Sequence, residues 1–170
     1  MKIDLYIDFD GVILNTIDVT YSMYDRVKDE YSDMKDFYKS LDWKMIFELC
    51  LPINDSINNI NRLVDSNLYN VYILSHVVTD SEEQEKRKFI SRNFDDVKLI
   101  AVPRDVDKCD VVDCFNAVLV DDYMGNLVKW ESRGGIAIKF SDKGKKYNIM
   151  SISNLGMLID KYNDIKKLIK

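Results

Sequence analysis

Acidic or hydroxyl side chains follow three of the short apolar runs in this chain. Asp8 and Asp10 come after the first run, Ser75 closes another, and Asp121 and Asp122 close a later one. Clustered carboxylates repel one another and stay ionised together only when a cation joins them. Oxygen ligands without histidine or cysteine favour Mg²⁺, which takes one or two carboxylates and a substrate phosphate. If these runs are neighbouring strands, the four aspartates form a Mg²⁺ site for an anionic substrate.

The spacing of Asp8 and Asp10, with one residue between them, suits phosphoryl transfer. One carboxylate can attack phosphorus and form an aspartyl-phosphate, while the other protonates the leaving oxygen and later deprotonates water. Gly11 permits a turn that would bring both carboxylates toward the metal. Ser75 can donate a hydrogen bond to a phosphoryl oxygen, and a lysine would neutralise the phosphoryl charge. These residue types therefore indicate chemistry on a phosphate ester.

The elements that would position these residues follow a regular order. Apolar runs without polar alternation suit strands that are covered on both faces, and they occur at residues 3–9, 71–74, 97–102, 117–120 and 136–140. Helical patterns lie at residues 56–64, 81–94, 124–132 and 154–169, and the Ser81/Gln84 pair resembles a capping box. This order predicts an α/β fold with a Rossmann-like parallel sheet and helices on both faces. Residues 143–146 are expected to form a solvated loop.

One segment interrupts the alternation of strands and helices. About sixty residues separate the first predicted strand from the second, which is too many for one crossover helix. We predict a small helical cap at residues 16–53, with helices near 18–30 and 41–49, inserted after the first strand of a core formed by residues 1–15 and 54–170. Extra core helices are the alternative. The aromatic side chains of residues 16–53 are expected to be core contacts, or, for one or two of them, surfaces for stacking on a nucleobase. They are Tyr21, Tyr24, Tyr31, Phe37, Tyr38, Trp43 and Phe47.

Length and composition limit the classes of protein that fit. A chain of 170 residues forms one domain with room for a small insertion, and its net charge of −5 argues against binding a nucleic acid polymer. The three cysteines lack a paired spacing and are expected to be reduced thiols. Acidic residues come too early for a signal-peptide core, and no apolar run approaches the roughly 20 residues that span a bilayer. We expect a cytoplasmic protein that acts on a small molecule without binding a membrane.

The residues named above resemble the motifs of the haloacid dehalogenase-like (HAD) superfamily of phosphohydrolases. Asp8-Phe9-Asp10-Gly11-Val12 is similar to the first motif, Ser75 to the second, and Asp121-Asp122 to the fourth. The resemblance covers residues 1–15 and about 54–140. It implies that Asp8 is the nucleophile and that Asp10 is the general acid and base.

The third motif of this superfamily is a lysine that precedes the fourth strand. Lys108 lies 13 positions before Asp121, near an expected helix start, and is our candidate for binding the substrate phosphate. Arg104 is the competing candidate.

The position of the predicted cap resembles the first cap class of the superfamily. Its helical nature, the short chain and the Asp121-Asp122 doublet are similar to the 5′(3′)-deoxyribonucleotidase-like branch. We therefore predict a Mg²⁺-dependent phosphomonoester hydrolase that forms an aspartyl-phosphate and acts as a 5′-nucleotidase on (deoxy)nucleoside monophosphates. The alternatives are a phosphatase for sugar phosphates or other small metabolites, and a non-catalytic phosphate-binding module. The oligomeric state stays open.

Overall fold

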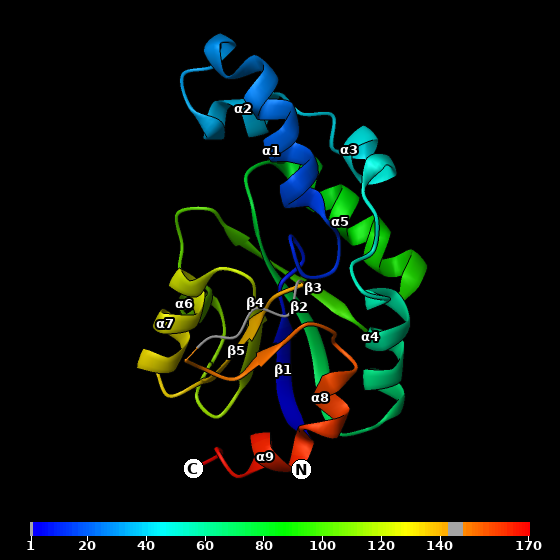
Figure 1. Ribbon diagram of the computed structural model, residues 1–170, viewed down its shortest axis with the longest axis vertical. Coiled ribbons are helices and arrows are strands. Elements are labelled where there is room, and N and C mark those ends of the chain that lie inside the picture. Colours follow the sequence, from blue (N-terminus) through cyan, green and yellow to red (C-terminus); the bar gives the residue numbers. More distant parts are fainter. Residues whose placement is uncertain (1, 143–147) are drawn as a thin grey trace.

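The computed structural model of this chain describes residues 2–142 and 148–170 (Figure 1). In these residues six strands form one sheet in the order β3-β2-β1-β4-β5-β6, and every neighbouring pair is parallel. The predicted α/β class with a Rossmann-like parallel sheet is therefore confirmed. The strands are β1 (Ile3–Ile7), β2 (Tyr69–Val77), β3 (Lys98–Pro103), β4 (Val118–Asp121), β5 (Ile136–Phe140) and β6 (Ser151–Ile152).

Five of these strands overlap the apolar runs that predicted them. The sixth, β6, was not predicted because a strand of two residues leaves no apolar run to recognise. The loop expected at residues 143–146 lies outside the described residues, as does Met1 at the start of the predicted core.

The strand order reverses at the centre of the sheet. From β1 the chain proceeds through β2 to β3 on one side, and from β4 through β5 to β6 on the other. Parallel α/β sheets bind ligands outside the carboxyl ends of the strands at such a point. Leu5 pairs with Val118 and Ile7 with Val120, so the carboxyl ends of β1 and β4 are neighbours.

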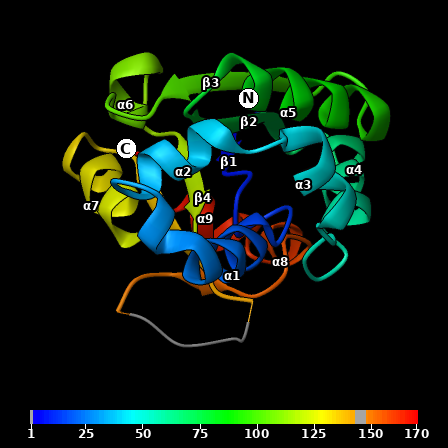
Figure 2. The same cartoon turned by 90° about the horizontal axis from the view of Figure 1, so that it is seen from above.

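Helices cover both faces of the sheet, and each face has its own hydrophobic cluster. Leu5 and Ile7 of β1 belong to one cluster and Tyr6 to the other, as alternation along a strand requires. Figure 2 shows α4 and α5 on one side of the strands and α6 and α7 on the other. The first cluster packs under α4 (Ser56–Asp65), α5 (Asp80–Asn93), α8 (Met157–Asp160) and α9 (Tyr162–Lys166), and the second under α6 (Lys108–Val111) and α7 (Met124–Ser132).

Two details of the predicted helices were wrong. Helix α5 is capped by Thr79, whose hydroxyl accepts from the backbone N–H of Glu82 (3.1 Å), instead of by a Ser81/Gln84 box. The long helix predicted at 154–169 is two short helices, α8 and α9. The carbonyl oxygen of Leu158, which a continuous helix would use internally, accepts instead from the hydroxyl of Tyr69 (2.9 Å).

The segment between β1 and α4 forms a helical layer over the carboxyl ends of the strands (Figure 1). Two of its helices were predicted, while α2 was missed. Asp33 and Asp42 cap α2 and α3 by accepting from backbone N–H groups. The elements are α1 (Thr16–Val27), the 3₁₀ helix η1 (Lys28–Glu30), α2 (Met34–Ser40) and α3 (Trp43–Leu49). None of the described helices is long and apolar enough to cross a membrane.

Helix α3 packs directly on the core. Trp43 and Ile46 belong to the same hydrophobic cluster as β1, and the ring of Phe47 lies 5.5 Å from that of Phe9. The inserted segment therefore shares apolar contacts with the sheet, and its division from the core at residues 16 and 53 stays a prediction.

Because α3 contributes to the common core, we expect its buried side chains to stabilise the whole protein. Ile46→Ala removes a fully buried side chain and should lower the free energy of unfolding by about 2–5 kcal/mol. Chemical denaturation should show one transition for the variant and for the wild type. The matched control Lys44→Ala, an exposed position on the same helix, should change stability by about 0.5 kcal/mol or less. A separate early transition for α1–α3 would contradict the shared core.

Candidate active site

The loop after β1 carries the first two predicted site residues. The backbone N–H of Asp8 donates to the carbonyl oxygen of Val120 in β4 (2.9 Å), so the loop begins beside the end of β4. The backbone then turns at Gly11, whose φ of 73° lies in the left-handed region. A Cβ at this position would lie 2.5 Å from Oδ2 of Asp122, which excludes a larger residue unless Asp122 moves. The turn therefore brings the first pair of aspartates against the second.

A buried lysine links the two pairs. Nζ of Lys108 lies 2.9 Å from Oδ1 of Asp8 and 2.7 Å from Oδ2 of Asp121, and its side chain is 1% exposed. Lys108 is the first residue of α6, and Asp121 is the last residue of β4. Arg104, the competing candidate for the third motif, is exposed to solvent. The geometry therefore favours Lys108 as the cation that faces the carboxylates.

Asp121 is fixed on both of its oxygens. The backbone N–H of Tyr123 donates to Oδ1, and the side-chain amide of Asn126 in α7 donates to Oδ2, each at 2.8 Å. This carboxylate is fully buried, so its donors offset the cost of removing a charge from water. Asp121 is thus a rigid part of the site.

Asp8 is held on one oxygen only. Its Oδ1 accepts from the backbone N–H of Phe9 (2.8 Å) and from Lys108. Within residues 2–142 and 148–170, no group donates a hydrogen bond to its Oδ2. One oxygen of Asp8 is therefore oriented by its partners while the other is available for chemistry.

Three of the four predicted metal ligands form one group. Asp8, Asp121 and Asp122 each offer an oxygen within 4.8 Å of the others. Burial, and then the nearby negative charge of Asp121, raise the pKa of Asp122 to about 6. Burial also raises the pKa of Asp8 to about 7, although Lys108 opposes the shift. Oxygen donors whose ionisation is opposed in this way fit a hard divalent cation such as Mg²⁺.

Asp10, the fourth predicted ligand, turns its carboxylate toward a different cation. Its Oδ2 lies 2.6 Å from Nζ of Lys86, and its Oδ1 accepts from the hydroxyl of Thr16 (2.7 Å). Burial opposes ionisation of Asp10, but the contacts with Lys86 and Thr16 outweigh it and lower its pKa. Ser75 is fully buried in β2, and its hydroxyl lies 3.3 Å from the same Oδ2. The structure thus brings Asp10 and Ser75 together as predicted, but around a second lysine.

Lys86 and its partner Glu82 were not predicted from the sequence. Both lie on α5 with their side chains buried, although most of the charged residues of this helix point to solvent. Their spacing of four residues, continued by the buried Ile90, was the available signal, since it places all three on one helix face. Thr16 and Asn126, which hold Asp10 and Asp121, were also missed.

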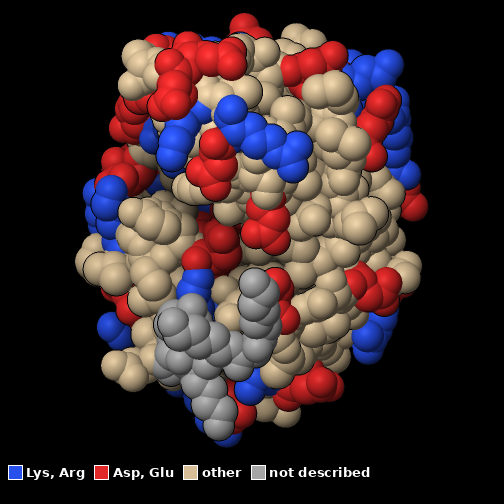
Figure 3. Space-filling view, turned by 45° about the horizontal axis from the view of Figure 1, so that its top comes forward, with Lys and Arg blue, Asp and Glu red and all other residues tan. Residues whose placement is uncertain are grey.

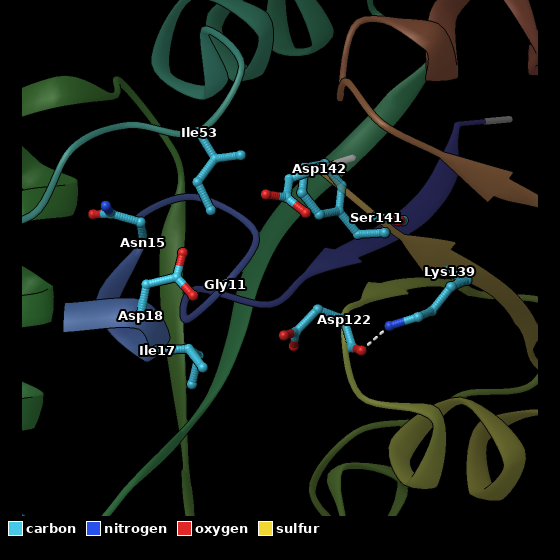
Figure 4. A pocket seen from close by; sticks show the side chains of 10 residues that line it. Gly11, Asn15, Ile17, Asp18, Ile53, Asp122, Lys139, Ser141 and Asp142 are labelled. Carbon is cyan, nitrogen blue, oxygen red and sulfur yellow. Dashed lines mark hydrogen bonds between the residues drawn. The ribbon is translucent and has the colours of Figure 1, made fainter. Parts of the chain in front are cut away.

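A pocket of about 170 Å³ opens beside the aspartate group. Figure 4 shows the carboxylates of Asp18 and Asp122 facing it from opposite sides, while Lys139 reaches the backbone oxygen of Asp122. Figure 3 shows acidic side chains in a hollow near the centre of this face of the molecule. The remaining lining residues include both polar and apolar side chains: Gly11, Asn15, Ile17, Ile53, Phe140, Ser141 and Asp142.

The aromatic side chains of the inserted segment divide between core and surface. Phe37 and Trp43 are buried, which agrees with their interpretation as core contacts. Tyr21 is 51% exposed and Tyr38 is half-buried. Burial raises the pKa of Tyr38. Its hydroxyl lies 2.9 Å from that of Thr20, one helical turn after Thr16, which contacts Asp10.

The aspartate group generates a test of metal binding that does not depend on activity. In metal-free protein, ionisation of Asp122 destabilises the fold as the pH rises from its ordinary pKa of 3.8 through about 6. Asp122→Asn avoids this cost and should melt at a higher temperature than the wild type at pH 8 in a chelator. Mg²⁺ should raise the melting temperature of the wild type and have a smaller effect on the variant.

The matched control is Asp142→Asn, an exposed aspartate of the same pocket that lies outside the group. It should respond to Mg²⁺ as the wild type does in the same thermal scans. Equal Mg²⁺ responses for all three proteins would exclude Asp122 as a ligand.

No protein-family model matches this sequence, and no curated protein matches it either. Solved structures do match over nearly the whole chain. A HAD phosphatase from Thermococcus onnurineus is 20% identical with a TM-score of 0.61, over 94% of this chain and 97% of that one. A HAD-superfamily hydrolase of subfamily IA from Geobacter sulfurreducens is 12% identical with a TM-score of 0.67, over 94% and 99%.

A third match is a D,D-heptose bisphosphate phosphatase from B. bronchiseptica, whose structure contains magnesium and phosphate. It is 12% identical with a TM-score of 0.52, over 96% of this chain and 99% of that one. These identities are too low to transfer an activity, but each match covers at least 94% of this chain. The chain therefore has the fold of the HAD-superfamily hydrolases.

Proposed function

We propose that this protein is a Mg²⁺-dependent phosphomonoester hydrolase that acts through an aspartyl-phosphate. The observation that carries the proposal is the hydrogen bonding of the two carboxylate oxygens of Asp8, which lies where the strand order reverses. One of its oxygens is held by Lys108 and by a backbone N–H, and the other has no donor in the described part of the chain. A second carboxylate, Asp10, follows two residues later, so a nucleophile and an acid/base group lie on one loop.

The two aspartates divide the reaction between them. Oδ2 of Asp8 attacks phosphorus, and the bond between phosphorus and the leaving oxygen breaks while Asp10 gives that oxygen a proton. Water then attacks the aspartyl-phosphate as Asp10 accepts its proton, which releases phosphate and restores Asp8. Lys86 favours the carboxylate form of Asp10, so Asp10 must first obtain the proton that it gives to the leaving oxygen. We propose that it takes this proton from the monoanion of the substrate, since a phosphate monoester has a second pKa of about 6.

The remaining polar groups bind and neutralise the phosphate. Lys108 faces the carboxylates and offsets negative charge on the transferring group, while the hydroxyl of Ser75 donates to a phosphoryl oxygen. Asp8, Asp121 and Asp122 would hold Mg²⁺, and Asp10 is left to proton transfer because its carboxylate faces Lys86. When bound, Mg²⁺ supplies further charge neutralisation to the phosphoryl oxygens.

We propose a nucleoside monophosphate as the substrate, as in the 5′(3′)-deoxyribonucleotidase-like branch. The support is the inserted segment over the site, where the exposed ring of Tyr21 suits stacking on a base, and where Tyr38 packs against the hydrophobic core but is only half-buried. The three cysteines are free, which supports a reducing location such as the cytoplasm.

A sugar phosphate or another small polar ester is the second candidate. The pocket beside Asp122 favours it, because its lining offers carboxylate and amide groups of Asp18, Asn15 and Asp142 as partners for hydroxyl groups. Turnover of a nucleotide panel compared with a sugar-phosphate panel separates the two candidates. Binding of phosphate without turnover of either panel would indicate a non-catalytic phosphate-binding module.

Asp8→Asn tests the nucleophile. The amide cannot form an acyl phosphate, so kcat for any phosphate ester should fall by at least about 10³-fold, the order that covalent catalysis contributes. Circular dichroism should show an unchanged fold. Asp29→Asn, an exposed position on the inserted segment, should keep full activity. Near-wild-type turnover by Asp8→Asn, with the sequence confirmed, would exclude the aspartyl-phosphate pathway.

Lys108→Ala and Arg104→Ala test which cation serves the phosphate. Because Lys108 contacts both carboxylates and Arg104 is exposed, the first variant should lose activity by about 10²-fold and the second by less than about 3-fold. Steady-state kinetics on one phosphate ester at saturating Mg²⁺ measure both. The opposite ranking would assign the role to Arg104.

A further inference from the structure

Lys86 is a buried cation that the proposed reaction does not use. Its side chain is fully buried, and four acceptors surround its ammonium group. They are Oδ2 of Asp10 at 2.6 Å, Oε1 of Glu82 at 2.8 Å, the carbonyl oxygen of His76 at 2.9 Å and Oγ of Ser75 at 3.0 Å. A buried charge persists only with such compensation, so this cluster is a built feature of the fold.

The arrangement excludes Lys86 from direct work on a substrate. An ammonium group has three N–H donors and no lone pair, and here four acceptors already compete for them. The ring of Phe9 lies 5.3 Å from Nζ and covers another side of the group. Lys86 can therefore act only through the groups that it contacts.

Glu82 fixes the position of Lys86. Its Oε1 accepts from Lys86 one helical turn away, and its Oε2 accepts from the backbone N–H of Val78 (2.7 Å). Thr79 caps the same end of α5 through the backbone N–H of Glu82. The ammonium group is thus tied to the junction of β2 and α5 and has little freedom to follow a moving partner.

Two predicted site residues depend on this fixed cation. The carboxylate of Asp10 is held between Lys86 on Oδ2 and Thr16 on Oδ1, so its orientation is determined. Lys86 also donates to Oγ of Ser75. This oxygen is therefore an acceptor toward Lys86, and the hydroxyl proton of Ser75 points away from the ammonium group. The distances from this hydroxyl to its two nearest acceptors are long, 3.3 Å to Oδ2 of Asp10 and 3.4 Å to the carbonyl oxygen of His76.

We propose that Lys86 is a positioning residue, which holds Asp10 in line for proton transfer to the leaving oxygen and keeps the hydroxyl proton of Ser75 available for a phosphoryl oxygen. This inference rests on the proposed function. It assigns Lys86 to the acid/base half of the site, whereas Lys108 belongs to the nucleophile half.

Leaving-group dependence tests the assignment. p-Nitrophenolate leaves without a proton, whereas an alcohol requires one, so a defect in proton transfer affects alkyl phosphates selectively. The measured quantity is the rate of leaving-group release in a single turnover, because the later attack of water needs Asp10 for every substrate. Lys86→Met, which removes the charge and nearly keeps the volume, should lower this rate for an alkyl phosphate by about 100-fold or more and for p-nitrophenyl phosphate by less than about 10-fold. Asp10→Asn should show the same selectivity in this first step.

Ile90→Ala is the matched control for damage to the helix. Ile90 is buried on the same face of α5, four residues after Lys86, and contacts the hydrophobic core instead of Asp10. This control should lower the melting temperature and reduce the rate of leaving-group release for both substrates by the same small factor. Glu82→Gln, which leaves Lys86 in place but weakens its anchor, should show the selectivity of Lys86→Met at a smaller magnitude.

If Lys86→Met loses the same factor in rate on both substrates, at a temperature well below its melting temperature, the assignment is overturned and Lys86 has a structural role. If Lys86→Met does not fold, equal losses in Glu82→Gln overturn it in the same way. A wild type that hydrolyses neither ester would contradict the proposed function, whereas an active wild type with unselective variants contradicts the role of Lys86 alone.

Discussion

The repulsion among carboxylates at one edge of the sheet is the constraint on which the rest of this structure depends. Asp8, Asp10, Asp121 and Asp122 meet where the strand order reverses, and Glu82 adds a fifth acidic group nearby. Three buried lysines, Lys86, Lys108 and Lys139, offset part of this charge. The charge that remains is negative, which suits a divalent cation far better than a bare anionic substrate.

The parallel sheet makes this crowding unavoidable. Parallel strands carry their carboxyl ends at the same edge, and β1 and β4 are hydrogen-bonded neighbours although most of the chain lies between them. Residues placed after each strand must then face one another. The packing of α5 and α6 against opposite faces of the sheet brings one lysine from each side, so each cation reaches a different aspartate of the loop after β1.

The sequence was sufficient to predict those parts of the site that end a strand. Asp8 and Asp121 follow apolar runs, and the topology rule for parallel sheets then places them together. Lys108 could be proposed from its spacing, but only its buried contacts distinguish it from Arg104. Lys86 could not be predicted, because it lies among many charged residues of α5 and only tertiary packing determines which of them are buried. The division between α8 and α9 could not be predicted either, since it involves a hydrogen bond from the hydroxyl of Tyr69 in β2, which is distant in the sequence.

The two aspartates of the loop have opposite electrostatic surroundings, and their order needs explanation. Burial raises the pKa of Asp8 to about 7, whereas Lys86 and Thr16 overcome burial and lower the pKa of Asp10. Taken alone, these directions would suit Asp10 as the ionised nucleophile and Asp8 as the acid. A divalent cation among Asp8, Asp121 and Asp122 would favour the carboxylate form of Asp8 and so permit its role as nucleophile. Asp10 stays a carboxylate beside Lys86, so the proton that it passes on comes from the monoanion of the substrate. The roles proposed for the two residues are therefore inseparable from the metal.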